Sequence, residues 1–279
     1  MTVGDTYRSL DSGMRAMLWV AGGLVALAGL QLFLLTEVTD RFFAWTIDPP
    51  LTAAFLGASY WASVFFEWGA ARARFWSYAR ISVPTVFVFT VLTLVVTVIH
   101  LDKFHFGAEF EAVTRLLTWA WLAIYVVVPV LMATLWIRQG RSGGEDPPRE
   151  RPIPLWLSFL VGAQAVVLAV VGVWLLVAPT SVPWPWELTA LTGRAIGAWL
   201  TSLSVAAAQF VWEGCLVRLA TAARAYTVLG LLQIVALIRY PDQFSWGSAG
   251  GVIYVIFLAS ILVVGLGSLS LRRQPRASS

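Results

Sequence analysis

Long apolar runs, almost free of charged residues, follow one another along nearly the whole sequence. A transmembrane helix needs about 20 consecutive, mostly apolar residues to cross the bilayer core. Runs of this length lie near residues 14–35, 51–68, 80–100, 115–137, 155–177, 190–213, 220–238 and 249–271. Because apolar residues are continuous in these runs, helices are favoured over the alternating strands of a barrel. We therefore predict an all-α integral membrane protein with eight transmembrane helices.

The overall composition excludes several classes of protein. Charged residues form 12% of the chain and hydrophobic residues 59%, whereas charged residues alone form about a quarter of a soluble domain. The 19 basic residues are scattered over short segments, so no basic surface that could bind nucleic acid is expected. Cys215 is the one cysteine, which excludes an intramolecular disulfide and a multi-cysteine metal site.

A short polar and aromatic motif occurs twice, as DKFHFG at residues 102–107 and as DQFSWG at residues 242–247. Further matches keep the same order in both halves of the chain; they are LTAAFLGA (51–58) with LTALTGRAIGA (188–198), FEWG (66–69) with VWEG (211–214), and FTVLTL (89–94) with YTVLGL (226–231). This shared order predicts a tandem duplication of a four-span unit. Since each unit has an even number of spans, the two copies should be parallel repeats.

A segment rich in glycine, proline and charge separates the two predicted repeats. This composition is typical of an exposed linker, and we assign it to residues 141–152. The expected domains are therefore an N-terminal four-helix repeat at 1–140 and a C-terminal four-helix repeat at 153–279.

The placement of basic residues predicts the orientation, because short cytoplasmic loops retain Lys and Arg. With eight spans and a cytoplasmic N-terminus, all but five of the 19 basic residues fall on the cytoplasmic side. The five others are Arg41, Lys103, Arg115, Arg194 and Arg239. We therefore expect a multi-pass protein of the cytoplasmic (inner) membrane with both termini in the cytoplasm.

The predicted external loops are short and rich in aromatic residues. The side chains of interest are Trp45, Phe104, Phe106, Trp184, Trp186, Phe244 and Trp246. One interpretation is an aromatic belt at the depth of the lipid headgroups. The other is an aromatic-walled groove, open to the outside, that binds a lipid tail or a flat hydrophobic molecule.

Two glutamates lie at the predicted cytoplasmic ends of corresponding spans. Glu67 is followed by Arg72 and Arg74, and Glu213 is followed by Arg218. Interfacial ion pairs with these arginines are one interpretation. The other is a pair of sites for proton or cation coupling, because ionisable residues within a bilayer often mark a functional site.

The two histidines, His100 and His105, flank Asp102 beside the first copy of the motif. They are weak candidates for a metal site, because a helix brings residues i and i+4 to one face and these are five apart. The second copy has no histidine. We therefore predict no metal site and no cofactor, and we expect only bound lipid.

None of the common catalytic motifs occurs in the sequence. The leading hypothesis is a non-catalytic accessory or scaffold subunit, or a binder of a hydrophobic molecule such as a lipid, quinone or pigment. The alternative is a transporter of a small or amphipathic solute, with its path between the repeats. A membrane enzyme that uses the histidines is a third hypothesis. Membrane lipids are the expected partners, with other membrane-protein subunits as a second class.

Overall fold

The computed structural model describes residues 6–273, and over this range the chain is helical without a β-strand. Its long helices are α1 (Ser12–Leu34), α3 (Pro50–Ala71), α4 (Ser82–Ile99), α5 (Ala112–Gly140), α6 (Leu155–Val177), α7 (Ala190–Glu213), α8 (Ala220–Arg239) and α9 (Ala249–Arg273). A short helix, α2 (Thr39–Phe42), follows α1. Each long helix coincides with one of the predicted apolar runs, which bears out the all-helical class.

Within residues 6–273, seven helices are long and apolar enough to cross a membrane, namely α1 and α4 to α9. These seven helices indicate a multi-pass membrane protein. The exception among the long helices is α3, whose sequence includes serine, tyrosine, tryptophan, glycine and Glu67. Most of its residues are buried by other helices, and a helix that is enclosed by protein does not need the hydropathy of one that faces lipid.

The ends of several helices follow from local sequence. The Asp11 carboxylate accepts hydrogen bonds from the backbone N–H groups of Gly13 and Met14 and so caps α1. Thr189 and Thr192 form a reciprocal capping box at the start of α7. At the other end of α7, Gly214 takes the left-handed conformation (φ 57°) that glycine adopts most easily.

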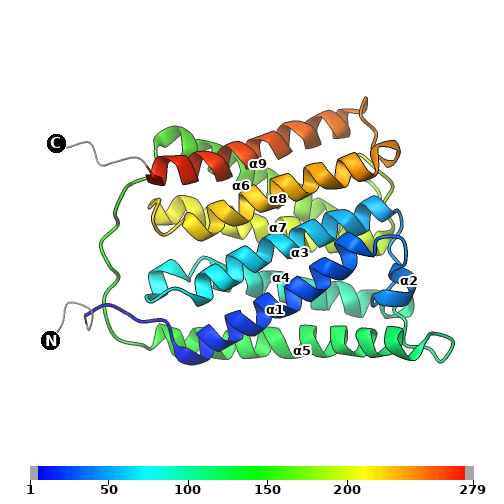
Figure 1. Cartoon of the computed structure of the whole chain (residues 1–279), viewed down its shortest axis with the longest axis horizontal. Coiled ribbons are helices and arrows are strands. Elements are labelled where there is room, and N and C mark those ends of the chain that lie inside the picture. Colours follow the sequence, from blue (N-terminus) through cyan, green and yellow to red (C-terminus); the bar gives the residue numbers. More distant parts are fainter. Residues whose placement is uncertain (1–5, 274–279) are drawn as a thin grey trace.

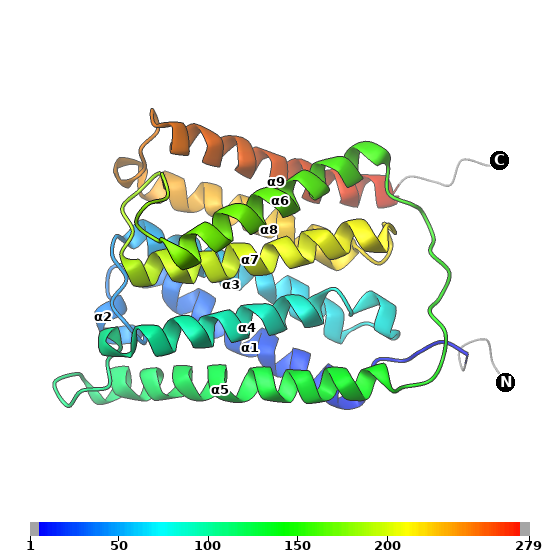
Figure 2. The ribbon, with the colours of Figure 1, turned by 180° about the vertical axis from the view of Figure 1, so that it is seen from behind.

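The long helices form two rows of four. One row runs α1–α3–α8–α9 (Figure 1) and the other runs α5–α4–α7–α6 (Figure 2). The backbones of the two rows come closest at the edges, where α1 meets α5 and α6 meets α9, and large side chains such as Tyr60 and Trp199 join the rows between them. Each row therefore combines two helices from the N-terminal half with two from the C-terminal half, and the halves interleave.

The two ends of the bundle are formed by different segments of the chain. Residues 138–154 run along the end at which the described chain also starts and finishes, which we call the linker end (Figure 1). The opposite end carries the loops 35–49, 100–111, 178–189 and 240–248, and we call it the aromatic end.

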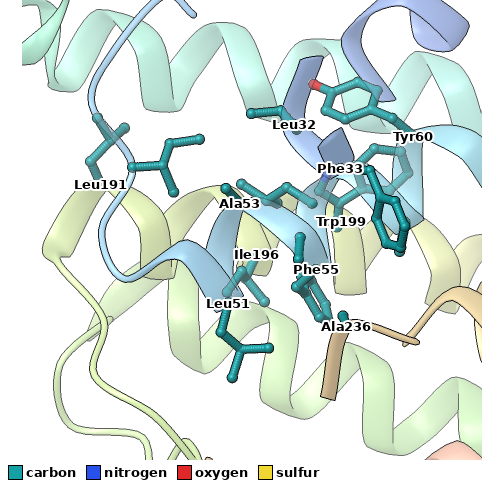
Figure 3. Close-up of a cluster of buried hydrophobic side chains, with 14 of the residues drawn as sticks. Leu32, Phe33, Leu51, Ala53, Phe55, Tyr60, Leu191, Ile196, Trp199 and Ala236 are labelled. Atoms are coloured by element: carbon teal, nitrogen blue, oxygen red, sulfur yellow. The ribbon is translucent and has the colours of Figure 1, made fainter. Parts of the chain in front are cut away.

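Glycine allows the first two long helices of each half to lie in backbone contact. A Cβ atom on Gly57 would lie 2.5 Å from the backbone nitrogen of Phe33, and one on Gly197 would lie 2.9 Å from that of Leu176. Between these contacts, large side chains such as Tyr60 and Trp199 fill the core (Figure 3).

Candidate functional site

The predicted aromatic rim residues form two clusters, one in each half of the chain. Trp45 and Phe104 pair through an isolated β-bridge, with ring centroids 5.2 Å apart. In the other half, Trp186 lies 5.1 Å from Trp184 and 6.1 Å from Phe244.

Burial differs among these residues. Trp45, Phe104, Trp186 and Phe244 are buried. Phe106 and Trp184 are half-buried, and Trp246 is 52% exposed. Most of the rim is therefore packed core, and Trp184 is the member that also lines a cavity.

That cavity, of about 250 Å³, lies between the rows in the C-terminal half. Its walls come from α6, α7, α8, α9 and the loop 178–189, with Phe55 and Ser59 of α3. Four lining residues are also exposed on the outer surface, namely Val167, Trp174, Pro183 and Ile253. The larger cavity therefore opens sideways between α6 and α9, on the surface that faces lipid in a membrane protein.

Few polar groups reach the larger cavity, and they are ordered by hydrogen bonds. Gln233 donates from Nε2 to the carbonyl oxygen of Phe55 (3.1 Å) and accepts at Oε1 from the Tyr254 hydroxyl (3.1 Å). The indole Nε1 of Trp184 is buried and has no hydrogen-bond partner within the described chain. A buried donor without an acceptor is costly, which sets Trp184 apart from the hydrogen-bonded Gln233 and Tyr254.

A smaller cavity, of about 50 Å³, lies between α3, α4, α7 and α8. Glu67 is one of its lining residues, is 3% exposed and has a carboxylate oxygen, Oε2, without a hydrogen-bond partner in residues 6–273. Ser59, Leu203 and Leu229 line both cavities, which are therefore neighbours.

Glu213 occupies a different environment, in an ionic cluster at the linker end. Its two carboxylate oxygens accept from Arg80 Nε and from Arg218 Nη1, the latter at 2.9 Å. Arg80 also pairs with Asp146, and Arg218 donates to the carbonyl oxygen of Pro147. Although burial by itself lowers the pKa of Arg80, Glu213 and Asp146 raise it overall. The cluster joins α7, the segments before α4 and α8, and the linker.

The two predicted glutamate sites are thus not brought together. The expected ion pair between Glu213 and Arg218 is present. Among the described residues, Glu67 forms no ion pair with Arg72, Arg74 or any other base.

The three weak candidates for a metal site, His100, Asp102 and His105, each contact different partners. Arg194 donates to Nε2 of His100 (2.8 Å). The pKa of His100 is lowered, mainly by burial and secondly by the positive charge of Arg194. Asp102 forms an exposed pair with Lys103 (3.1 Å). Over residues 6–273, no group of three His, Cys, Asp or Glu side chains is arranged to hold a metal ion.

His105 is buried in a pair of hydrogen bonds that suit the neutral ring. Nδ1 lies 3.1 Å from the carbonyl oxygen of Phe43 and therefore donates, which leaves Nε2 to accept from the Thr46 hydroxyl (3.1 Å). Burial lowers the pKa of His105, against the opposing effects of the Phe43 carbonyl and Asp40.

This depressed pKa predicts that acid destabilises the aromatic end. Below about pH 6.5 the unfolded chain binds a proton that folded His105 resists, so stability should fall as the pH decreases and should be constant above about pH 7. Unfolding midpoints of wild type and His105→Gln, measured in detergent across this range, check the prediction. His100 acts in the same direction, so the variant should lose only part of the slope. An unchanged slope in His105→Gln would contradict the assignment.

Several residues of the larger cavity could not be selected from the sequence. Trp174, Gln233 and Tyr254 lie within apolar runs, where a residue that faces a cavity resembles one that faces lipid. Gln233 carries the one usable signal, because an amide in the middle of an apolar run requires a partner.

Comparison with known proteins adds no functional information. No protein-family model, no curated protein and no solved structure matches this chain. The function is therefore argued from the geometry of the two cavities.

Proposed function

We propose that all eight long helices cross a cytoplasmic membrane, with both termini on the cytoplasmic side. The 22 residues of α3 extend over about 33 Å, which is sufficient for the bilayer core. Its position between α1 and α8 in one row supports the same depth for all three. The basic residues of the linker end support the orientation.

The chain is a tandem duplication in this proposal, with repeats at 1–140 and 153–279 and a linker at 141–152. Equivalent pairings support it, since α1 packs on α3 as α6 packs on α7, and α3 packs on α8 as α7 packs on α4. The hydrogen bond from His105 N to Ala44 O (3.1 Å) has a counterpart from Ser245 N to Pro185 O (2.8 Å). These pairings also support parallel repeats, related by an axis along the membrane normal.

The helix ends refine the alignment of the two repeats. α4 ends at Ile99 and α8 ends at Arg239, so corresponding residues here are 140 positions apart. Phe89 then corresponds to Leu229, which lies three residues beyond Tyr226, its match in the sequence.

The protein acts, in this proposal, as a non-catalytic binder of one hydrophobic molecule in the larger cavity. The observation that carries it is an apolar cavity of about 250 Å³ that opens sideways between α6 and α9. This volume is below the usual range for drug-sized ligands, so it suits a ring or a short acyl segment whose remainder lies in the bilayer. The unpaired Trp184 indole favours a ligand with a carbonyl oxygen, such as a quinone, a pigment or an ester lipid.

Larger side chains fill the equivalent space in the N-terminal half. Tyr60, Phe89 and Tyr125 pack together there, with the two tyrosine hydroxyls 2.7 Å apart. By the spacing of 140, Leu200 stands in place of Tyr60 and Leu229 in place of Phe89. The C-terminal half is therefore the one with room for a ligand.

This difference suggests a variant that fills the larger cavity with residues the fold already accommodates elsewhere. Leu200→Tyr with Leu229→Phe should reduce the amount of co-purified hydrophobic molecule by about tenfold or more, the effect of losing about 1.4 kcal/mol of binding free energy. Extraction of protein purified gently from its native membrane, followed by mass spectrometry, measures this amount. Leu231→Phe is the matched control, because Leu231 is 51% exposed on the outside of α8.

The control should retain the molecule at the wild-type level. Equal retention by the filled variant would show that the bound molecule occupies another place and would overturn the assignment. A binder of this kind also suits an accessory subunit that presents its outer helices to lipid and to neighbouring membrane proteins.

A transporter is the second candidate, favoured by the position of the smaller cavity between α3, α4, α7 and α8. Duplicated transporters often place their substrate path between the repeats. Time-dependent solute uptake into proteoliposomes distinguishes this function from binding alone.

A further inference from the structure

The smaller cavity encloses a carboxyl group in surroundings that cannot tolerate an isolated negative charge. Glu67 is 3% exposed, and its Oε2 atom has no partner within the described chain. Among the residues that line this cavity, none carries a positive charge. Because a buried, unpaired carboxylate is strongly disfavoured, Glu67 must either hold a proton or share the cavity with a cation.

The hydroxyl groups of the cavity favour a cation over an anion. Ser59, Ser63, Ser202 and Thr85 each donate their hydroxyl hydrogen to a helix carbonyl, at 2.6–3.1 Å. Thr85 Oγ1 also accepts from Gln209 Nε2 (3.5 Å), whereas the oxygen lone pairs of the three serines remain available as ligands. Tyr226 lines the same cavity, and its hydroxyl is buried and has no partner in residues 6–273.

The charge and the size of the cavity narrow the choice of cation. One carboxylate and several neutral oxygens balance a single positive charge, and hard cations prefer oxygen ligands. A volume of about 50 Å³ exceeds the roughly 30 Å³ that a water molecule occupies in the liquid. It has room for a small ion and for water, since about 10–15 Å³ of such volume holds one water molecule.

We propose that the smaller cavity binds one sodium ion, with Glu67 as its charged ligand and with protonation of Glu67 as the competing state. The site lies between the rows, where helices of both halves contribute oxygens: Ser59, Ser63 and Glu67 from α3, Thr85 from α4, Ser202 from α7 and Tyr226 from α8. It does not depend on a ligand in the larger cavity.

The titratable groups around the site leave Glu67 as the proton acceptor at neutral pH. Tyr226 of α8 lines the same cavity as Glu67. Tyr60 of α3 and Tyr125 of α5 are close enough to interact electrostatically with Glu67. α1, α4 and α7 present no titratable side chain to the cavity. Since tyrosine ordinarily loses its proton near pH 10, competition between sodium and protons should follow Glu67 alone.

Sodium binding to the purified full-length protein tests the proposal directly. Isothermal titration with NaCl, at constant ionic strength in choline chloride, should detect one sodium ion per chain. The apparent affinity should fall about tenfold for each unit of pH decrease where Glu67 is protonated. Infrared difference spectra recorded with and without sodium should show the loss of a carboxylic acid band and the gain of carboxylate bands, because sodium displaces the proton from Glu67.

Three variants separate the site from other effects. Glu67→Gln should abolish both the heat and the infrared change, whereas Glu37→Gln, at an exposed position, should leave both unaltered. Tyr226→Phe keeps the carboxyl group, so it should bind sodium about tenfold more weakly and retain the infrared change; it also provides the test if Glu67→Gln does not fold.

Two outcomes overturn the proposal: no sodium binding by the wild type between about pH 6 and pH 9, or binding that is equal in Glu67→Gln. Either outcome leaves the assignment of the larger cavity intact, because that assignment is measured by the retained hydrophobic molecule.

Discussion

Replacing Glu213 by glutamine is expected to lower the free energy of unfolding by about 3–5 kcal/mol, the usual effect of breaking a buried ion pair from one side. The Glu213 side chain is 0% exposed and pairs with both Arg80 and Arg218, while Asp146 supplies the second negative charge of the cluster. Arg218 is itself 3% exposed, so it would remain as a buried charge without its carboxylate. Thermal or denaturant unfolding in detergent, followed by circular dichroism, measures the change.

Two companion variants establish that the effect comes from burial. Asp102→Asn removes one member of an exposed pair with Lys103 and should leave stability nearly unchanged, because exposed ion pairs contribute little. Glu213→Leu combined with Arg218→Met removes both charges of the buried pair and should be more stable than Glu213→Gln. A Glu213→Gln protein as stable as the wild type would contradict the structural role of the cluster.

Replacing Gly57 by valine is expected to destabilise the protein by about 2–3 kcal/mol, as overpacking of a tight core does. The added Cβ atom would lie 2.5 Å from the backbone nitrogen of Phe33 and 2.8 Å from the carbonyl carbon of Leu32. Because both contacts are with backbone, a change of rotamer cannot relieve them, and α1 must move away from α3. Unfolding measurements under the same conditions give the change.

Gly23 provides the matched control for this prediction. It lies in α1, and a Cβ atom placed on it meets nothing within 4 Å. Gly23→Ala should therefore be neutral or should stabilise the protein by up to about 1 kcal/mol, through higher helix propensity. If Gly57→Ala were as stable as Gly23→Ala, the close approach of α1 and α3 would not exist in the protein.

The sequence predicted one wall of the larger cavity but not the cavity itself. Trp184 stands out in the sequence because it lies in an aromatic loop, where composition changes visibly from the neighbouring helices. Tyr254 and Trp174 do not, since every face of a membrane helix is apolar, whether it meets lipid, protein or a cavity. The usual contrast between a polar outer face and an apolar inner face is therefore missing.

For the two glutamates, the sequence indicates that they matter but not which partners they have. Their isolation in apolar sequence predicted that Glu67 and Glu213 matter, because charge in such surroundings is rare. Which of them finds a partner depends on Arg80 and Asp146, residues far away along the chain. Similar local sequence therefore leads to a neutralised ionic cluster in one case and to an unpaired acid in the other.

Sequence by itself determined the helical class, the positions of the long helices and the grouping of aromatic residues in the loops at one end. These features depend on the composition of contiguous segments, because transfer from water to lipid is a sum over neighbouring residues. Tertiary structure alone decided that the halves interleave in two rows, that Glu213 is paired while Glu67 is not, and that the larger cavity lies in the C-terminal half. Those outcomes depend on which side-chain shapes meet across helices, and the side chains that meet are distant in sequence.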